Sequence, residues 1–134
     1  MQVKRFIDTD KHTIYTTFTG ELTLDEMRGD MVRQATEPGY SPDMSGILDF
    51  RNAIVKLTED EFQQLAEIIK KHPQVFGRTR RAFLVDSGFA FIQFNKFAAL
   101  TKEGLTEYRV FRDEKKARDW IEEVVVKRRF GGLA

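Results

Sequence analysis

The sequence predicts an α/β domain with a mixed, mostly parallel five-stranded sheet, about four helices and the element order β-β-α-β-α-β-α-β-α. Two strand-like segments at the N-terminus are joined by a turn, which is typical of a hairpin. Each later short apolar run follows a helical segment, which indicates parallel strands, right-handed crossovers and helices that cover the sheet faces. The 134 residues are expected to form a single domain, with a core over about 3–125 and a frayed tail over 126–134.

The strands are predicted from short-range patterning. Residues 3–8 form the first strand, and 12–19 the second, because side chains at 14, 16 and 18 alternate with those at 13, 15 and 17. Aspartates in the intervening turn can satisfy local backbone donors. The short apolar runs 46–50, 81–86 and 108–112 are typical of buried strands.

The helices are predicted from their caps and apolar stripes. Thr23 and Thr58 each precede a glutamate by three residues, which is the spacing of a capping box. Ser87 and Asp113 stand where the two later helices begin, and both residue types cap helices well. The first helix is broken at 37–42, the second ends at 70–73, and the third is expected over 89–103.

Composition excludes several classes of protein. Cysteine is absent, so disulfides and thiol nucleophiles are excluded. Lys and Arg number 22 against 21 Asp and Glu, and a net charge of +1 gives no basic excess, so no nucleic acid is expected. Charge follows Met1 within four residues, and the longest apolar run is 124–126. We therefore expect no secretion signal, no transmembrane segment and a cytoplasmic location.

Three segments carry a resemblance to a known family: 81–85 (Arg-Ala-Phe-Leu-Val), 89–97 and 108–121. The last is the most specific, because a strand is followed by an acidic cap, an alanine and a tryptophan beside an aliphatic residue. The chain resembles the STAS-like fold of anti-sigma-factor antagonists, and more closely the bacterial SpoIIAA-like family, which is related to CRAL-TRIO lipid-binding domains. The resemblance covers about residues 3–125 and implies a fold more than an activity.

The resemblance stops short of a phosphorylation switch. Anti-sigma-factor antagonists carry a phosphorylatable serine in the turn after the third strand, whereas residues 49–54 here read Asp-Phe-Arg-Asn-Ala-Ile. The nearest hydroxyl belongs to Thr58, which is interpreted as a helix cap. A role switched by a kinase is therefore not expected.

Candidate ligand-binding residues lie at the carboxyl ends of two of the predicted parallel strands. They are Asp49, Arg51, Asn52, Asp86, Ser87 and Gly88. Ligands of open α/β sheets bind at the carboxyl ends of strands, and the free N–H groups at a helix start favour an anion. The two turns are expected to line one shared edge, and the alternative is that they are ordinary turns with Ser87 as a cap.

The predicted helix 89–103 carries a wider apolar arc than a sheet-covering helix needs. Phe91, Phe94 and Ala98 lie together, and further apolar side chains extend both edges of the arc. Three interpretations stay open: packing between the sheet and a neighbouring helix, a homodimer interface, or an apolar ligand pocket that includes Phe91 and Phe94.

Other chemistry is sparse. His12 and His72 lie about sixty residues apart and fit no metal-ligand spacing, so no catalytic residue, metal or cofactor is predicted. Basic residues at 70, 71, 78, 80 and 81 and at 127–129 are interpreted as a solvated face. The alternatives for them are an anionic ligand, nucleic acid or lipid headgroups.

The sequence therefore favours a non-enzymatic STAS-like module that acts through protein partners or self-association, such as a homodimer. The alternative is a carrier or sensor of a small apolar or anionic, lipid-like ligand. An enzyme that uses Asp49 and Asp86 as an acid–base pair is the least favoured hypothesis, because acidic residues are common in such turns.

Overall fold

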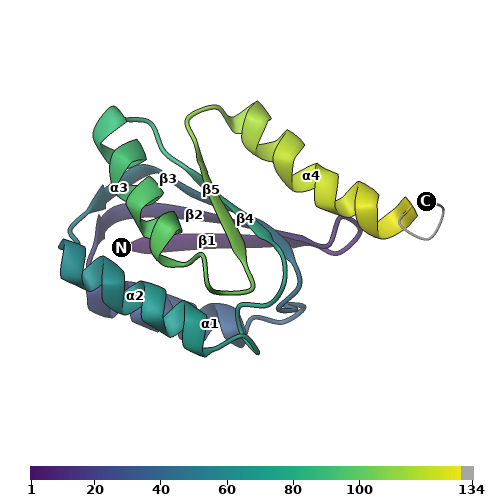
Figure 1. Ribbon diagram of the computed structural model, residues 1–134, viewed down its shortest axis with the longest axis horizontal. Coiled ribbons are helices and arrows are strands. Elements are labelled where there is room, and N and C mark those ends of the chain that lie inside the picture. The colour runs from purple at the N-terminus through teal and green to yellow at the C-terminus, as the bar shows by residue number, and fades with distance from the viewer. Residues whose placement is uncertain (131–134) are drawn as a thin grey trace.

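The computed structural model describes the backbone of residues 1–130 and the side chains of residues 1–123. Five strands form one sheet in the order β1-β2-β3-β4-β5 (Figure 1). β1 pairs antiparallel with β2, and every later pair of neighbours is parallel. The strands are β1 Gln2–Asp8, β2 Thr13–Leu22, β3 Ser45–Val55, β4 Arg80–Leu84 and β5 Glu107–Phe111. The predicted mixed, mostly parallel sheet is confirmed.

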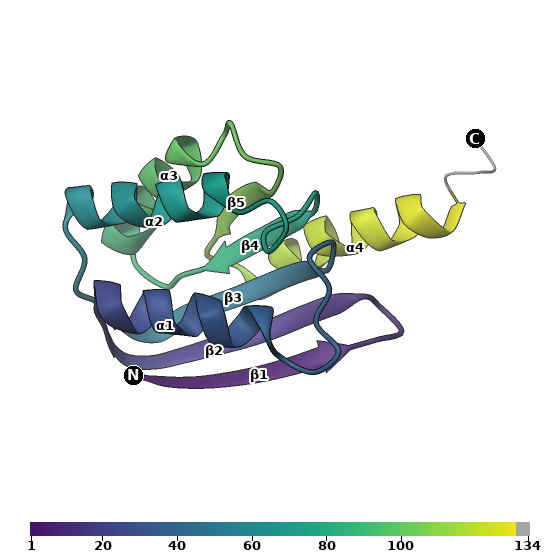
Figure 2. The same ribbon diagram turned by 90° about the horizontal axis from the view of Figure 1, so that it is seen from below.

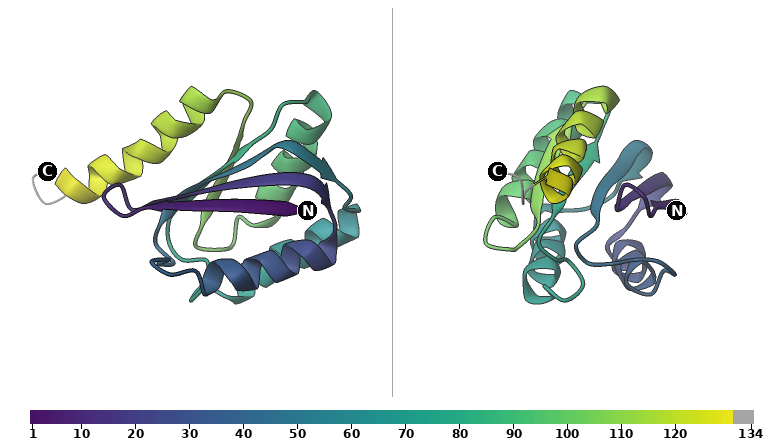
Figure 3. Two further views of the ribbon diagram at one scale, coloured as in Figure 1. Left: turned by 180° about the vertical axis from the view of Figure 1, so that it is seen from behind. Right: turned by 90° about the vertical axis from the view of Figure 1, so that its right-hand side faces the viewer.

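Four helices complete the predicted element order. They are α1 Leu24–Ala35, α2 Glu59–Lys71, α3 Gly88–Leu100 and α4 Glu114–Phe130. The three connecting helices α1, α2 and α3 pack on one face of the sheet (Figure 2), and α4 packs on the other, across the sheet from α1 and α2 (Figure 3). Because the strands cross the sheet in sequence order, crossovers of one hand leave all three connecting helices on the same face.

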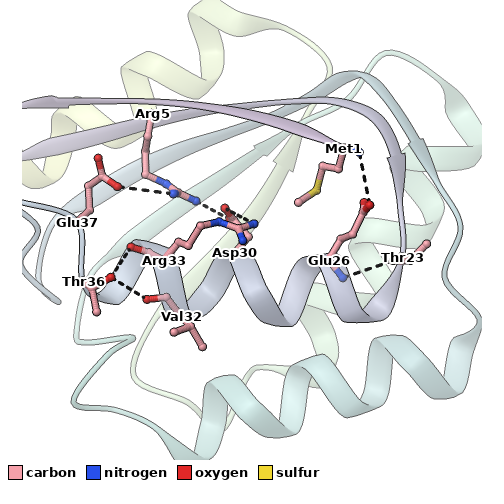
Figure 4. Close-up of polar contacts among 9 residues, drawn as sticks. All are labelled: Met1, Arg5, Thr23, Glu26, Asp30, Val32, Arg33, Thr36 and Glu37. Atoms are coloured by element: carbon pink, nitrogen blue, oxygen red, sulfur yellow. Dashed lines mark hydrogen bonds and ion pairs between the residues drawn. The ribbon is translucent and has the colours of Figure 1, made fainter.

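Capping residues start the helices as the sequence predicts. Thr58 and Glu61 form a complete capping box at α2, and the Ser87 side chain accepts a hydrogen bond from the Ala90 N–H at α3. At α1 the Thr23 side chain accepts from the Glu26 N–H, but the Glu26 carboxylate lies 3.5 Å from the N-terminal amine (Figure 4). Each cap satisfies a backbone donor that the helix itself cannot.

Two hydrophobic clusters lie on opposite faces of the sheet. The larger lies under α1, α2 and α3, and phenylalanine rings from sheet and helices meet there; its buried rings are Phe18, Phe50, Phe62, Phe76, Phe83, Phe94 and Phe97. The smaller lies under α4, where Ala117, Trp120 and Ile121 cover β3 and β4. Alternate residues of β4 therefore serve two different cores.

Some predicted boundaries differ from the structure. β3 extends five residues beyond the expected end at Phe50, because it continues alongside β2 as far as the Leu22–Val55 pair. α3 ends at Leu100 rather than at 103, where the Thr101 hydroxyl donates to the Ala98 carbonyl 2.8 Å away. The backbone of α4 is helical to Phe130, and residues 131–134 lie outside the described residues, so the frayed tail over 126–134 stays a prediction.

Candidate functional site

The predicted turn at 49–52 is wrong, because Asp49, Arg51 and Asn52 all lie inside β3. The register of β2 against β3 shifts between Thr17 and Thr19, and this irregularity lets β3 continue where a turn was expected. Asp49 pairs in register with Leu84, the last residue of β4. It therefore does lie where a parallel strand ends, but the strand that ends there is β4.

Asp49 belongs to an ion-pair cluster that joins β3 to α4. The Arg51 guanidinium donates two hydrogen bonds to the Asp49 carboxylate, at 3.0 and 2.9 Å, and a third to Glu114 at 3.0 Å. Burial raises the pKa of Asp49, but the hydrogen bonds and charge of Arg51 outweigh burial, so the pKa lies below its ordinary value. These side chains tie the start of α4 to the sheet.

Asp86 and Ser87 lie in the connection from β4 to α3, Gly88 is the first residue of α3, and all three are exposed. The Ser87 hydroxyl is engaged as the helix cap, and the Asp86 carbonyl accepts a hydrogen bond from Arg112 at 3.3 Å. Within residues 1–123 no hydrogen bond or ion pair joins this connection to Asp49. The two predicted turns thus approach the same end of β4 without forming a joint cluster.

The aromatic helix α3 uses only part of its apolar arc in the core. The Phe94 ring is buried, with its centroid 4.7 Å from that of Phe50 and 5.2 Å from that of Phe83, and Phe91 packs partly against the same cluster. Phe89, which lies at one edge of the predicted arc, is 73% exposed, and Ile92, which the sequence did not single out, is 58% exposed. The wide apolar arc of α3 therefore has two parts: one packs in the core, and the other, here called the free face of α3, is exposed.

The free face of α3 borders a groove of about 580 Å³ between α2 and α3, here called the α2–α3 groove. Its apolar lining is contributed by both helices and the loop before α2: Leu57, Phe62, Phe89, Ile92, Phe97 and Leu100. Glu59 and Lys96 stand on opposite walls with their charged atoms 3.4 Å apart, and both side chains are largely exposed.

A second, interior cavity lies between the sheet and helices α1 and α2. Its volume is about 50 Å³, and its lining is mainly aromatic and aliphatic, with Phe94 among its walls. Its polar lining comes from Asp30, Gln34, Arg81 and Tyr108. The buried position of Arg81 was missed, although the alternation of β4 contains the signal, because residue 81 shares a face with the core residues 83 and 85.

The expected solvated face is found only in part: Lys71 and Arg78 are exposed, whereas Arg81 is not. Arg81 is only 1% exposed. Arg80, on the opposite face, pairs with Glu123 at 2.7 Å and with Glu107 at 3.6 Å, while Lys70 pairs with Glu67 at 2.7 Å. The side chains of 127–129 lie outside the described residues.

The histidines take part in separate local contacts. His12 Nε2 lies 2.8 Å from the Asp43 carboxylate, and His72 Nδ1 lies 3.2 Å from the Gln74 amide. In the described part of the chain, no group of three or more His, Cys, Asp or Glu residues is placed to hold a metal ion. Over the same residues, no helix has the length and apolar character needed to cross a membrane.

The hairpin, three same-face crossovers and opposing C-terminal helix define the class of fold as α/β with a five-stranded mixed sheet. The structure is similar to the crystal structure of an uncharacterized protein of the DUF3478 family, with a SpoIIAA-like fold, from Shewanella loihica PV-4. The match covers 89% of this chain and 93% of that chain, with a TM-score of 0.57 and 16% sequence identity. A scan of protein-family profiles and a search of curated proteins find no match. The likeness shows that this chain has a SpoIIAA-like fold, as the sequence predicts.

Proposed function

We propose that the chain is a non-enzymatic STAS-like module that acts by self-association, and that a second copy binds at the α2–α3 groove. The observation that carries the proposal is the exposure of Phe89 and Ile92, at 73% and 58%, beside that groove. The two side chains lie three residues apart on α3, so they project from the same side of the helix.

The exposed apolar surface of α3 is not needed to complete the core. Phe94 and Phe97 already pack against the sheet and against Phe62 of α2. Large apolar side chains gathered at the edge of a groove usually mark an interaction site, whereas single exposed ones need no explanation. Burial of a phenylalanine or isoleucine side chain is worth about 1.5–3 kcal/mol, and four such side chains in a dimer contribute toward the cost of association, which is about 4–15 kcal/mol.

A second copy fits this surface because the surface is complementary to itself. In a two-fold dimer the same patch meets its own copy, so projecting side chains must find a recess on that same patch. Here Phe89 and Ile92 project beside the recess that they help to line. Glu59 and Lys96 pair with each other within one copy, and across a two-fold axis the same two residues can exchange partners between the copies.

The non-enzymatic part of the proposal is supported by the engagement of the polar groups at the strand ends. Asp49 is held by Arg51, and the Ser87 hydroxyl caps α3. A general base or nucleophile needs a partner and room for a substrate, and neither group offers a free pair. A cytoplasmic site of action is part of the same proposal and is supported by the cysteine-free composition alone.

Sedimentation velocity over a range of protein concentrations tests self-association. We expect a reversible monomer–dimer equilibrium with a Kd of about 1–100 µM, as for a small interface with few anchor residues. Phe89→Asp and Ile92→Asp should each weaken the dimer at least about tenfold, because each places a charge in the buried centre of the interface.

The matched control is Phe6→Asp. Phe6 is 63% exposed, similar to Phe89 and Ile92, but it lies on β1 and not on α3. The control should leave the dimer unchanged. A wild-type protein that stays monomeric at about 1 mM, or a dimer lost in Phe6→Asp but kept in Phe89→Asp, contradicts the proposal.

A further inference from the structure

Arg81 is a charged residue on the core face of the sheet. It is the second residue of β4, and alternation places its side chain with Phe83 and Val85, under α1 and α2. Its side chain is 1% exposed, which makes it the largest of the fully buried side chains among the described residues. Arginine stays protonated in proteins, so this position carries a buried positive charge.

The hydrogen bonds of Arg81 are incomplete. Its Nη2 donates to the Tyr40 hydroxyl at 2.9 Å and reaches the Met44 carbonyl at 3.5 Å, and the guanidinium stands 5.7 Å from the centroid of the Tyr40 ring. Its buried Nε has no hydrogen-bond partner among the described residues. The guanidinium therefore retains donor capacity in the core, where an unmet donor is costly.

The neighbouring buried charges do not neutralise Arg81. Asp30 of α1 pairs with Arg5 of β1, and these two charges cancel (Figure 4). Arg33 and Glu37 add weaker, more distant pairs to the same two residues. Within residues 1–123 no carboxylate lies within 4.0 Å of Arg81. The core beneath α1 and α2 thus holds one positive charge more than it holds negative charges.

Arg81 and Asp30 line the same interior cavity. A volume of about 50 Å³ exceeds the ~10–15 Å³ that one water needs, so the cavity has room for a molecule of a few heavy atoms but not for a lipid chain. Burial raises the pKa of Tyr108, another lining residue, to about 12, against the opposing charge of Arg81, so its hydroxyl stays neutral. Met27 and Met31 also line the cavity, and methionine side chains adjust readily to an occupant.

The lining has one further unmet polar atom. Oδ1 of Asp30 is buried and accepts no hydrogen bond among the described residues, and Arg33 Nη2, 3.9 Å away, is too distant to donate one. Two residues of the lining therefore have an unmet polar atom, a donor at Arg81 Nε and an acceptor at Asp30 Oδ1. The Nε–H of Arg81 can donate a charge-assisted hydrogen bond to a carboxylate, and a hydroxyl on the same molecule can donate to Asp30.

We propose that the interior cavity between the sheet and helices α1 and α2 binds a short hydroxycarboxylate, with its carboxylate on Arg81 and its hydroxyl on Asp30. This site is separate from the α2–α3 groove and does not depend on self-association. It gives the domain a small-molecule ligand of a definite size and charge.

The side-chain Nε–H signal of Arg81 in a ¹H–¹⁵N NMR spectrum reports binding directly, and Arg81→Met identifies that signal by its loss. Titration of the wild-type protein with glycolate should move the signal saturably, with a Kd of about 1 mM or tighter, the range expected for so few ligand atoms. Acetate lacks the hydroxyl and should bind about tenfold more weakly, because the Asp30 acceptor is then unmet. Chloride at the same ionic strength should leave the signal in place.

Two variants separate ligand binding from folding. In Arg81→Met, glycolate should no longer raise the melting temperature, whereas in Arg80→Met, altered at the adjacent residue on the opposite face, the rise should persist. Circular dichroism checks that both variants fold. If the Arg81 signal is unmoved by about 50 mM glycolate, or if chloride moves it equally, the proposal is overturned and the cavity is a solvent-filled or purely structural feature.

Discussion

The neighbouring residues Arg80 and Arg81 lie on opposite faces of the sheet and differ in their ion-pair partners. Arg80 points to the α4 face, where two glutamates pair with it and the Trp120 ring lies 5.1 Å from its guanidinium. Arg81 points to the face covered by α1, α2 and α3, where no carboxylate of the described residues pairs with it. Among the described residues, the arginine on the α4 face has carboxylate partners, whereas the arginine on the three-helix face has none.

The helices of the two faces also differ in the apolar surface that their described residues expose, although the α4 face carries an exposed ring of its own in Phe6 of β1, which stacks on Tyr15. Ala117, Trp120 and Ile121 of α4 are all buried against the sheet. On the three-helix face, α3 buries Phe94 and leaves Phe89 exposed beside the α2–α3 groove. Locally unfavourable features concentrate where a protein works rather than where it only folds. Both binding sites that we propose lie in the three-helix layer.

The largest expected effect distinguishes the two edges of α3. Phe94→Ala should lower the free energy of unfolding by about 3–5 kcal/mol, and Trp120→Ala on the other face should cost as much, because each removes a buried aromatic ring. Phe89→Ala should cost less than about 0.5 kcal/mol, because its ring is largely exposed. Urea unfolding of dilute, monomeric protein measures all three. A cost for Phe89→Ala close to that for Phe94→Ala would contradict the claim that Phe89 lies outside the core.

The next prediction compares Arg81 with Arg80. Replacing each by methionine should change the free energy of unfolding in opposite directions. Arg81→Met should raise the free energy of unfolding by about 1–4 kcal/mol, since it replaces an uncompensated buried charge by an apolar side chain of similar length. Arg80→Met should lower it by up to about 1 kcal/mol, since it breaks partly exposed ion pairs. Denaturant unfolding at neutral pH checks both. Loss of stability in Arg81→Met would show that the Tyr40 and Met44 contacts outweigh the buried charge.

The smallest expected effect concerns the ion pair between Asp49 and Arg51 beside the start of α4. Burial alone raises the pKa of Asp49, and Arg51 brings it below the ordinary 3.8. Because the folded-state pKa is lowered, the stabilisation is present above pH 3.8 and is lost as the pH falls through the folded value. Arg51→Met should therefore raise the pKa of Asp49, measured by ¹³C NMR of its carboxyl, and cost less than about 1 kcal/mol at neutral pH.

Arg118→Met is the control for that measurement. Arg118 pairs with Glu114 at 3.6 Å and has no ion pair with Asp49 among the described residues. The pKa of Asp49 should stay low in this variant. An equal rise in both variants would mean that the start of α4, rather than Arg51, sets the pKa.

Most of the fold could be predicted from the sequence, because it is encoded locally. The period of two over 12–19 and the caps at Thr58 and Ser87 each specify one element without reference to the rest. The length of β3 could not be predicted in this way. Residues 51–55 are extended because β2 lies beside them, and that pairing is a long-range property.

The candidate sites were only partly predictable. The excess apolar arc of α3 was visible in the sequence, but which edge stays exposed depends on how α2 packs against it. The basic neighbours of Arg81 in the sequence favour a solvated face, whereas strand alternation places Arg81 on the core side with Phe83 and Val85. Its missing carboxylate partner depends on residues far apart in the chain, such as Asp30 and Tyr40, and only the structure brings these together.

Hydrogen–deuterium exchange at low and high protein concentration tests most directly whether the three-helix layer, and not the α4 face, mediates association. The α2–α3 dimer predicts that backbone amides of α3 (88–100) and of the facing part of α2 exchange more slowly at high concentration. Amides at 114–123 of α4 should exchange at the same rate at both concentrations. Exchange that is independent of concentration everywhere, or that slows only in α4, would contradict the account.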